Sequence, residues 1–395
     1  MHIRLLQEHD TPAAKELWGY AFEKDEPFYS WYFKEVFQSG NCIGVFIDDR
    51  LACCLQIPSY KLQMNGNLFK SSYVVGVVTS PEYRNKGIMK SLLKKAIEEI
   101  RSRNHFVSIL MPFDTAFYRP YGWELCYSQL SYETPIVNLK DYRNKEGNFH
   151  RVDREKDMNA LDRIYREYLK HNHGYVIRSE ENWKVLLQDL YHYGGCAAIL
   201  HDSSNQPVGY IQYTLKGDKL IVKEMAYVTH WAKQAIFGFL YSHYSQANTI
   251  QWPAPANDNT YLFLRDTIKP SPTNSITLRP FMCGRVIDVS EALEHSRYPE
   301  TVEADFRIKI EDAYASWNNT TFHVLIKKGI PVVKEDTTLL PDLECGINTF
   351  AQLFFGAVSF QDAIAMDTVI LHHPNLEDSL SRIFVRKDNF INEYY

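Results

Sequence analysis

The segment from Val77 to Met89 has the residue types of an anion-binding loop. It joins an apolar stretch, Val77-Val78-Thr79, to a helical pattern that starts at Ile88, with two cations and a glycine between them. A helix that begins just after a strand presents unpaired N–H groups and the positive end of its dipole, which suits a diphosphate. Gly87 lets the backbone approach such a ligand closely. The residues alone leave an ordinary solvated loop as the alternative.

The elements that must position this loop follow a mixed α/β pattern. Tyr73 to Val78 is a nearly unbroken β-branched run, which predicts a strand buried on both faces. Apolar residues from Ile88 to Ile100 recur at helical spacing, and Phe106 to Met111 is typical of a further short strand. Strands and helices in this order predict a twisted α/β sheet.

The same pattern partly repeats further along the chain. A predicted strand at 220–228 and helix at 233–245 follow the strand at 73–78 and the helix at 88–103 at an offset of roughly 150 residues, which indicates two domains of one fold. The stretch Thr229 to Lys233 stands where the loop would be, and it has no glycine.

A third region begins near residue 280, after a proline-bearing boundary at 269–273. Its apolar runs predict a helix capped by Ser290 and strands at 286–289, 304–310, 313–317 and 321–327.

Two motifs give the chain a resemblance to a known family. Arg84 to Met89 resembles the pyrophosphate loop [QR]-x-x-G-x-[GA] of the GCN5-related N-acetyltransferases: Arg84 and Gly87 match, and Met89 departs from the small final residue. A larger residue there is similar to one subfamily, the enhanced intracellular survival (Eis) proteins. The segment from Phe117 to Trp123 resembles the aromatic-Tyr segment after the family's fifth strand.

The resemblance implies a mixed α/β chain with three domains. They are a catalytic acetyltransferase domain at 1–135, a degenerate second copy at 136–280, and a sterol-carrier-like domain at 281–395 whose C-terminal tail returns to the active site. The implied reaction is acetyl transfer from acetyl-CoA to a primary amine of a small cationic acceptor, polyamine-like or aminoglycoside-like. No metal is expected, because neither His171-x-His173 nor His372-His373 has a Cys or carboxylate cluster at zinc spacing. The residues it implies for acetyl-CoA are Val77, Val78, Thr79, Arg84, Asn85, Lys86, Gly87, Ile88, Met89, Phe113 and Asp114.

Two catalytic residues are implied by the resemblance. Tyr118 aligns with the tyrosine that protonates the leaving thiolate, and a phenol with a pKa near 10 is a reasonable donor. Without the motif, a packed aromatic is the alternative reading of Tyr118. The subfamily's base is the carboxylate of the last residue, here Tyr395. A free α-carboxyl has a pKa of about 3.5, so burial beside aromatic rings has to raise it.

The acceptor site is implied by an acidic and aromatic segment near the N-terminus. Asp25, Glu26 and Trp31 resemble the subfamily's acceptor wall, and Glu393 joins them if the tail docks. Carboxylates and aromatic rings both attract ammonium groups. A solvated helix end is the alternative for the acidic residues.

The composition argues against several other classes of protein. A net charge of −5 without a basic cluster argues against nucleic acid, and the absence of a long apolar run argues against a membrane. The odd number of cysteines, without C-x-x-C spacing, indicates reduced thiols and a cytoplasmic protein.

Family resemblance further implies a homo-oligomer, a hexamer. The alternatives are a protein or peptide lysine acetyltransferase and a lipid carrier acting through the C-terminal domain.

Overall fold

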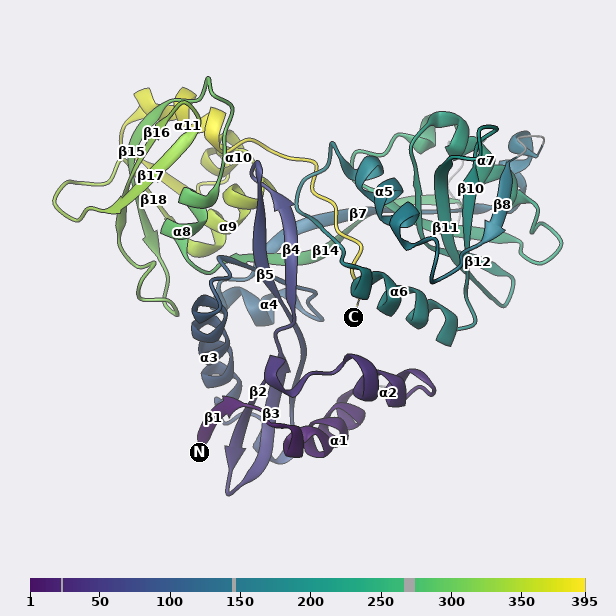
Figure 1. The fold of residues 1–395 in the computed structure, drawn as a ribbon. Coiled ribbons are helices and arrows are strands. Elements are labelled where there is room, and N and C mark those ends of the chain that lie inside the picture. Colours follow the sequence, from purple (N-terminus) through teal and green to yellow (C-terminus); the bar gives the residue numbers. More distant parts are fainter. Residues whose placement is uncertain (23, 144–146, 266–273, 395) are drawn as a thin grey trace. The chain divides into compact units, whose positions relative to one another are not determined.

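The computed structural model describes residues 1–22, 24–143, 147–265 and 274–394. The chain divides into two compact units (Figure 1). Unit 1 comprises Met1–Tyr127, His173–Val176 and Phe281–Tyr395, and unit 2 comprises Ser128–Asn172 and Ile177–Pro280. Two strands, β7 (Glu124–Pro135) and β14 (Ser275–Val286), each have residues in both units.

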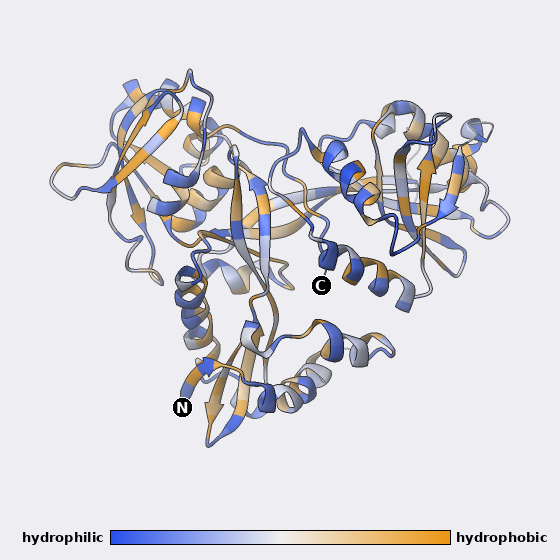
Figure 2. Cartoon of the chain, viewed as in Figure 1, coloured by the Kyte–Doolittle hydropathy of each residue, from blue (hydrophilic) through white to orange (hydrophobic). Residues whose placement is uncertain are grey.

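The first sheet of unit 1 has the strand order β1-β2-β3-β5-β6-β14. Its helices include α3, whose buried face holds the apolar residues predicted from their spacing, while its other positions are mostly hydrophilic (Figure 2). The elements are β1 (His2–Leu5), β2 (Cys42–Ile47), β3 (Arg50–Gln56), β4 (Ser59–Met64), β5 (Asn67–Thr79), β6 (Val107–Leu110), β9 (Tyr175–Val176), α1 (Thr11–Ala21), α2 (Phe28–Trp31), α3 (Ile88–Ser102) and α4 (Thr115–Tyr118).

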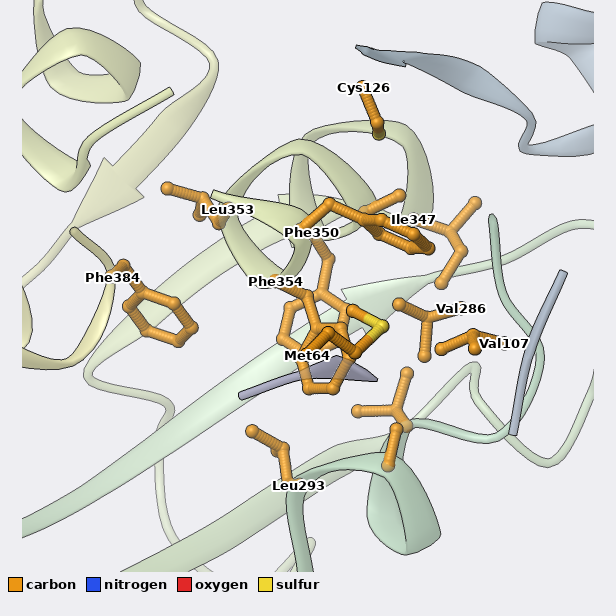
Figure 3. Packing of buried hydrophobic residues seen from close by; sticks show 14 of the residues in the cluster. Met64, Val107, Cys126, Val286, Leu293, Ile347, Phe350, Leu353, Phe354 and Phe384 are labelled. Carbon is orange, nitrogen blue, oxygen red and sulfur yellow. The ribbon is translucent and has the colours of Figure 1, made fainter. Parts of the chain in front are cut away.

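The C-terminal part of unit 1 has its own sheet, in the order β17-β16-β15-β18-β19. Its core is continuous with that of the first sheet: Phe350 and Phe354 pack in one cluster with Met64 of β4 and Val286 of β14 (Figure 3). The elements are β15 (Ala304–Glu311), β16 (Thr321–Lys327), β17 (Ile330–Glu335), β18 (Leu343–Gly346), β19 (Val369–Leu371), α8 (Val289–His295), α9 (Ile347–Phe355), α10 (Phe360–Ala365) and α11 (Glu377–Ile383).

Unit 2 has the strand order β7-β13-β12-β11-β10-β8. The predicted strand and helix of the repeat are confirmed as β12 and α7, although α7 begins at His230 because the Thr229 side chain caps it by accepting from the Ala232 N–H. The elements are β8 (Asn148–Arg151), β10 (Cys196–His201), β11 (Pro207–Lys216), β12 (Lys219–Tyr227), β13 (Thr249–Pro255), α5 (Met158–Leu169), α6 (Glu180–His192) and α7 (His230–Tyr241).

Three local predictions in the third region are wrong. The strand expected at 286–289 is absent apart from Val286, because β14 ends there and Asp288 already caps α8, which starts at Val289. The cap of α8 is Asp288, whose carboxylate accepts from the Glu291 N–H, and not Ser290. Residues 313–317 form no strand, because the Asp312 carboxylate accepts the N–H groups of Tyr314 and Ala315 and turns the chain. Separately, none of the helices in the described ranges is long and apolar enough to cross a membrane.

Candidate active site

Strand β5 has an open edge where it approaches the predicted loop. It pairs in parallel with β6 only from Ser71 to Val74, whereas on its other edge it continues alongside β3 as far as Thr79. The pairing with β3 shifts register here, and Gly76 has a positive φ of 60°. A glycine within an apolar strand marks such a bulge. The backbone beyond Val74 therefore has polar groups facing away from β3 that no described strand pairs.

The loop after β5 ends in an uncapped helix. Asn85 and Gly87 have positive φ values of 60° and 73°, and Gly87 is the N-cap of α3 with no side-chain hydrogen bond. Among the described residues, no acceptor pairs with the backbone N–H groups from Asn85 to Met89. A Cβ added at Gly87 would meet no atom within 4 Å. These features provide both the unpaired donors and the open space that an anion needs.

Two exposed cations of the loop are held over aromatic rings. The Arg84 guanidinium lies 5.6 Å from the Tyr20 ring centre, and its Nε donates to the Thr79 carbonyl at 3.2 Å. The Lys86 ammonium lies 5.3 Å from the Tyr83 ring centre. Ile88 is buried and Met89 is half-buried, so the loop is anchored at the point where it enters the helix.

The start of α7, the corresponding position in unit 2, differs from the start of α3. The first turn of α7 already has an acceptor, since the Thr229 Oγ1 binds the Ala232 N–H at 3.1 Å. Lys233 is buried, and its Nζ lies 3.2 Å from Asp258 Oδ2. This end of unit 2 therefore lacks the open, uncapped helix start that makes the first loop suited to an anion.

Tyr118 lies in α4, in the cluster that also contains Val74 and Leu110, where β5 and β6 part. Its side chain is 3% exposed, and burial raises the pKa of the phenol. Its hydroxyl forms no hydrogen bond with any described residue. A buried phenol of this kind stays protonated at neutral pH and keeps its proton available.

Phe113 and Asp114 precede Tyr118 at the start of α4. Asp114 is the N-cap of this helix, and its Oδ1 accepts from the Ala116 N–H at 2.9 Å. Phe113 is 78% exposed, and its ring centre lies 5.7 Å from that of Tyr118. The roles of both residues toward acetyl-CoA stay predictions.

The C-terminal tail lies against β5. Tyr73 of that strand donates a hydrogen bond from its hydroxyl to the Glu393 carbonyl at 3.3 Å, and Glu393 is 2% exposed. Tyr394 is exposed, with its ring centre 5.1 Å from that of Phe281. Tyr395, the predicted base, lies outside the described residues, so its role stays a prediction.

The tail is fixed by a set of hydrogen bonds that the sequence did not reveal. The Asn389 amide donates to the carbonyls of Cys126 and Phe355, both at 2.9 Å, and its Oδ1 lies 2.7 Å from His173 Nδ1. The Phe390 N–H donates to the His173 carbonyl at 3.1 Å. An aromatic chain end was the one available signal, and it did not identify these partners.

The predicted acceptor residues lie around α2. Asp25 and Glu26 are exposed, and the Glu26 carboxylate accepts a hydrogen bond from the Ser30 hydroxyl at 2.7 Å. Trp31 is half-buried beside the aromatic cluster of Trp18, Tyr32 and Phe33. That cluster adjoins β5, because a Cβ at Gly76 would come within 2.5 Å of Trp18. The acceptor role of Asp25, Glu26 and Trp31 stays a prediction.

Three family models match the chain. An acetyltransferase (GNAT) domain matches residues 2–126, a second acetyltransferase (GNAT) domain matches 174–286, and a sterol carrier protein domain matches 289–392. The exact boundaries of the three predicted domains stay a prediction.

Several known proteins are similar to this chain over most of its length. An uncharacterized N-acetyltransferase of Streptomyces avermitilis is 20% identical over 339 residues, 80% of each chain. A probable N-acyltransferase from Enterococcus faecalis V583 superposes with a TM-score of 0.88 at 21% identity, covering 100% of this chain and 99% of the other. Eis1 from Mycobacterium abscessus superposes with a TM-score of 0.76 at 16% identity and covers 100% of both chains.

These structural likenesses show a shared fold, and the family models supply the family. The expected mixed α/β fold class is confirmed, as is the reading of the chain as an N-acetyltransferase. The chain therefore belongs to the GCN5-related N-acetyltransferases, with two domains of that family followed by a sterol carrier protein domain.

Proposed function

We propose that this N-acetyltransferase binds acetyl-CoA between the open edge of β5 and the first turn of α3, and acetylates a primary amine of a small cationic acceptor. The observation that carries the proposal is the uncapped start of α3, with N–H groups from Asn85 to Met89 that no described residue accepts. Five such donors beside Arg84 and Lys86 suit a diphosphate better than any neutral ligand.

The open edge of β5 complements this anion site. Val77, Val78 and Thr79 offer backbone donors and acceptors that fit the amides of a pantetheine arm, as strand addition does for a peptide. Bound acetyl-CoA supplies the thioester that reacts and the thiolate that leaves.

Tyr118 serves as the proton donor to the leaving sulfur in this proposal. Its raised pKa keeps the proton on the phenol, and the same apolar surroundings disfavour a bare thiolate beside it. The deprotonated amine attacks the thioester carbonyl, so that the C–N bond forms as the C–S bond breaks and the Tyr118 hydroxyl proton moves to the sulfur. The second proton lost by the new amide nitrogen then restores the Tyr118 phenol.

The Tyr395 carboxylate takes the proton from the acceptor's ammonium in this proposal. The buried tail that leads to it contacts Tyr73, on the same strand as Val77 and Val78. Asp25, Glu26 and Trp31, with Glu393, attract the remaining positive charges of a polyamine-like or aminoglycoside-like acceptor. A cytoplasmic location remains the expectation from the cysteine pattern, and a hexamer remains the expectation from family resemblance.

An acceptor screen tests the proposal. Purified protein is incubated with acetyl-CoA and single amines, and released thiol is measured. Polyamines and aminoglycosides should react faster than lysine-containing peptides of matched charge. Faster reaction with the peptides would show that the acceptor is a protein or peptide lysine and not a small cationic amine. A melting temperature unchanged by saturating coenzyme A would refute the proposed cofactor site.

A further inference from the structure

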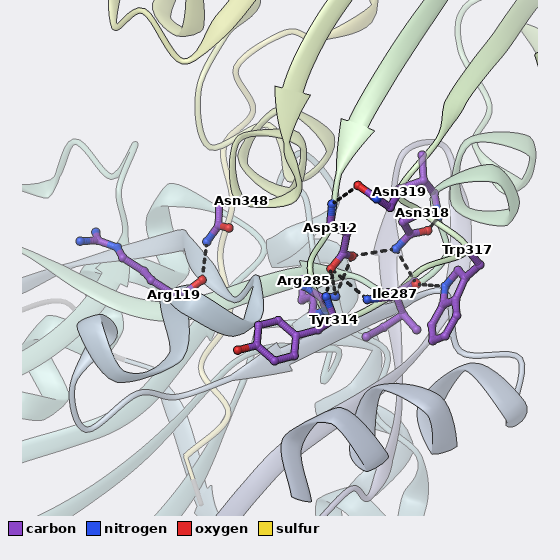
Figure 4. Close-up of polar contacts among 11 residues, drawn as sticks. Arg119, Arg285, Ile287, Asp312, Tyr314, Trp317, Asn318, Asn319 and Asn348 are labelled. Atoms are coloured by element: carbon purple, nitrogen blue, oxygen red, sulfur yellow. Dashed lines mark hydrogen bonds and ion pairs between the residues drawn. The ribbon is translucent and has the colours of Figure 1, made fainter. Parts of the chain in front are cut away.

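The segment Asp312–Asn319, between β15 and β16, is a loop fixed by buried polar contacts (Figure 4). The Asp312 carboxylate accepts two hydrogen bonds from Arg285 Nη2, at 3.0 and 2.8 Å, and both side chains are fully buried. The Asn318 amide donates to the Ile287 carbonyl at 3.0 Å. Breaking a buried, hydrogen-bonded ion pair is costly, so these contacts hold the loop in this conformation.

This loop brings Tyr314 to the first turn of α3. The Tyr314 N–H is bound by Asp312, while its ring points away from the hydrogen-bonded cluster (Figure 4). The ring centre lies 5.8 Å from Lys90 Nζ and 4.9 Å from the ring centre of Tyr121. A residue of the sterol carrier protein domain thus contacts the helix that begins at the proposed diphosphate site.

The charges around this helix start oppose helix stability. The first turn of α3 holds no acidic residue. Lys90 lies in that turn, and Lys86 lies directly before the N-cap Gly87. Positive charges near a helix N-terminus are repelled by its dipole. Lys90 has no carboxylate partner in the described part of the chain. An anion bound at the start of α3 would relieve this repulsion. The arrangement therefore favours anion binding at the expense of the stability of the helix.

We propose that Lys90 and Tyr314 form a subsite for the 3′-phosphoadenosine end of acetyl-CoA. The inference rests on the proposed function, since the diphosphate must first lie at the start of α3. Coenzyme A continues from its diphosphate into an adenosine that carries a 3′-phosphate. The Lys90 ammonium pairs with that phosphate, and the Tyr314 ring stacks on the adenine. The C-terminal domain thereby takes part directly in cofactor selection.

A series of shortened cosubstrates tests both contacts. The kcat/KM values are measured for acetyl-CoA, for its 3′-dephospho form, and for S-acetyl-4′-phosphopantetheine. Lys90→Met should lower the preference for acetyl-CoA over the dephospho form by about 1.5- to fivefold, the range of an exposed ion pair. Lys94→Met, one helical turn further along, is the matched control and should keep the wild-type preference.

The Tyr314 contact is tested by comparing the dephospho form with S-acetyl-4′-phosphopantetheine, which lacks the adenosine. Tyr314→Ala should lower the preference for the dephospho form over the phosphopantetheine form by about fivefold or more, and Tyr314→Phe should keep that preference because it retains the ring.

The outcomes separate this inference from the proposed function. A wild-type enzyme indifferent to the 3′-phosphate, or an unchanged preference in Lys90→Met, overturns the Lys90 contact. If Tyr314→Ala lowers kcat/KM equally for all three cosubstrates, the Tyr314 ring has only a structural role and the proposed stacking on adenine is wrong. Failure of the wild-type protein to bind coenzyme A removes the proposed function, and this inference with it.

Discussion

Gly87 is the position where one added carboxylate most directly tests anion binding at the start of α3. Its Cα faces open space, and a Cβ there would meet no atom within 4 Å, so a longer side chain fits without a clash. Gly87→Glu places a negative charge beside the N–H groups proposed to bind the diphosphate. Binding of coenzyme A should then weaken, because the two anions repel.

The size of the effect follows from the exposure of the loop. Two unit charges 4 Å apart repel by about 1 kcal/mol in water and by about 4 kcal/mol at an effective dielectric constant of 20. Gly87 is exposed, so a value of about 1–3 kcal/mol is expected, which weakens coenzyme A binding by roughly five- to 150-fold. The positive φ of 73° adds a strain of about 1–2 kcal/mol to folding itself.

Gly217→Glu is the matched control. Gly217 has a positive φ of 61°, and a Cβ there also meets no atom within 4 Å, but it lies in the turn between β11 and β12. Both variants carry similar backbone strain, and only Gly87→Glu changes the proposed site. Titration calorimetry with coenzyme A measures the affinities, and thermal melts report folding. If folded Gly87→Glu binds coenzyme A as tightly as Gly217→Glu, the assignment of the diphosphate site is wrong.

Three further predictions concern catalysis and stability. Tyr118→Phe should lower kcat by about 10²- to 10⁴-fold with little change in KM for acetyl-CoA, in steady-state kinetics; an unchanged kcat would exclude the proton-donor role. Deletion of Tyr395 should abolish transfer and spare coenzyme A binding, whereas Tyr395→Ala, which keeps a terminal carboxylate there, should remain active. Burial lowers the pKa of His105 to about 4, below its unfolded value near 6.5, so its stabilisation is complete above pH 6.5 and is lost as the pH falls toward 4. Between pH 7.5 and pH 5 this should cost about 2 kcal/mol in urea unfolding, and His105→Gln should show a smaller loss.

Local patterns were enough to predict much of the fold. β5 contains the β-branched run at 73–78, and α3 contains the helical spacing from Ile88 to Ile100. A strand buried on both faces and a helix buried along one stripe each show directly in the pattern of apolar residues. The strand expected at 313–317 failed for a physical reason. Its apolar residues resemble a strand, but one carboxylate, Asp312, captures two backbone donors and turns the chain.

The site was only partly accessible to such reasoning. Gly87 and its neighbours are local, and their spacing indicates a loop before a helix. The partners of the tail are not local: His173 and Asn389 lie far apart in the chain and meet through backbone and side-chain hydrogen bonds. Nothing in residue spacing predicts such long-range pairs, and the same holds for Tyr314 and Lys90.

Unit 1 is assembled from the two ends of the chain, and this order matters for biosynthesis. Strand β6 pairs with β14, and Met64 shares a core with Phe350, so the N-terminal third leaves the ribosome without its eventual partners. At about 5–20 residues per second, roughly 10–50 s separate the emergence of its last residue from that of the final residues. The edge of β6 stays unpaired until β14 has emerged, and the apolar surface around Met64 stays exposed until Phe350 has emerged. Nascent chains of this enzyme should therefore depend on chaperones until translation ends.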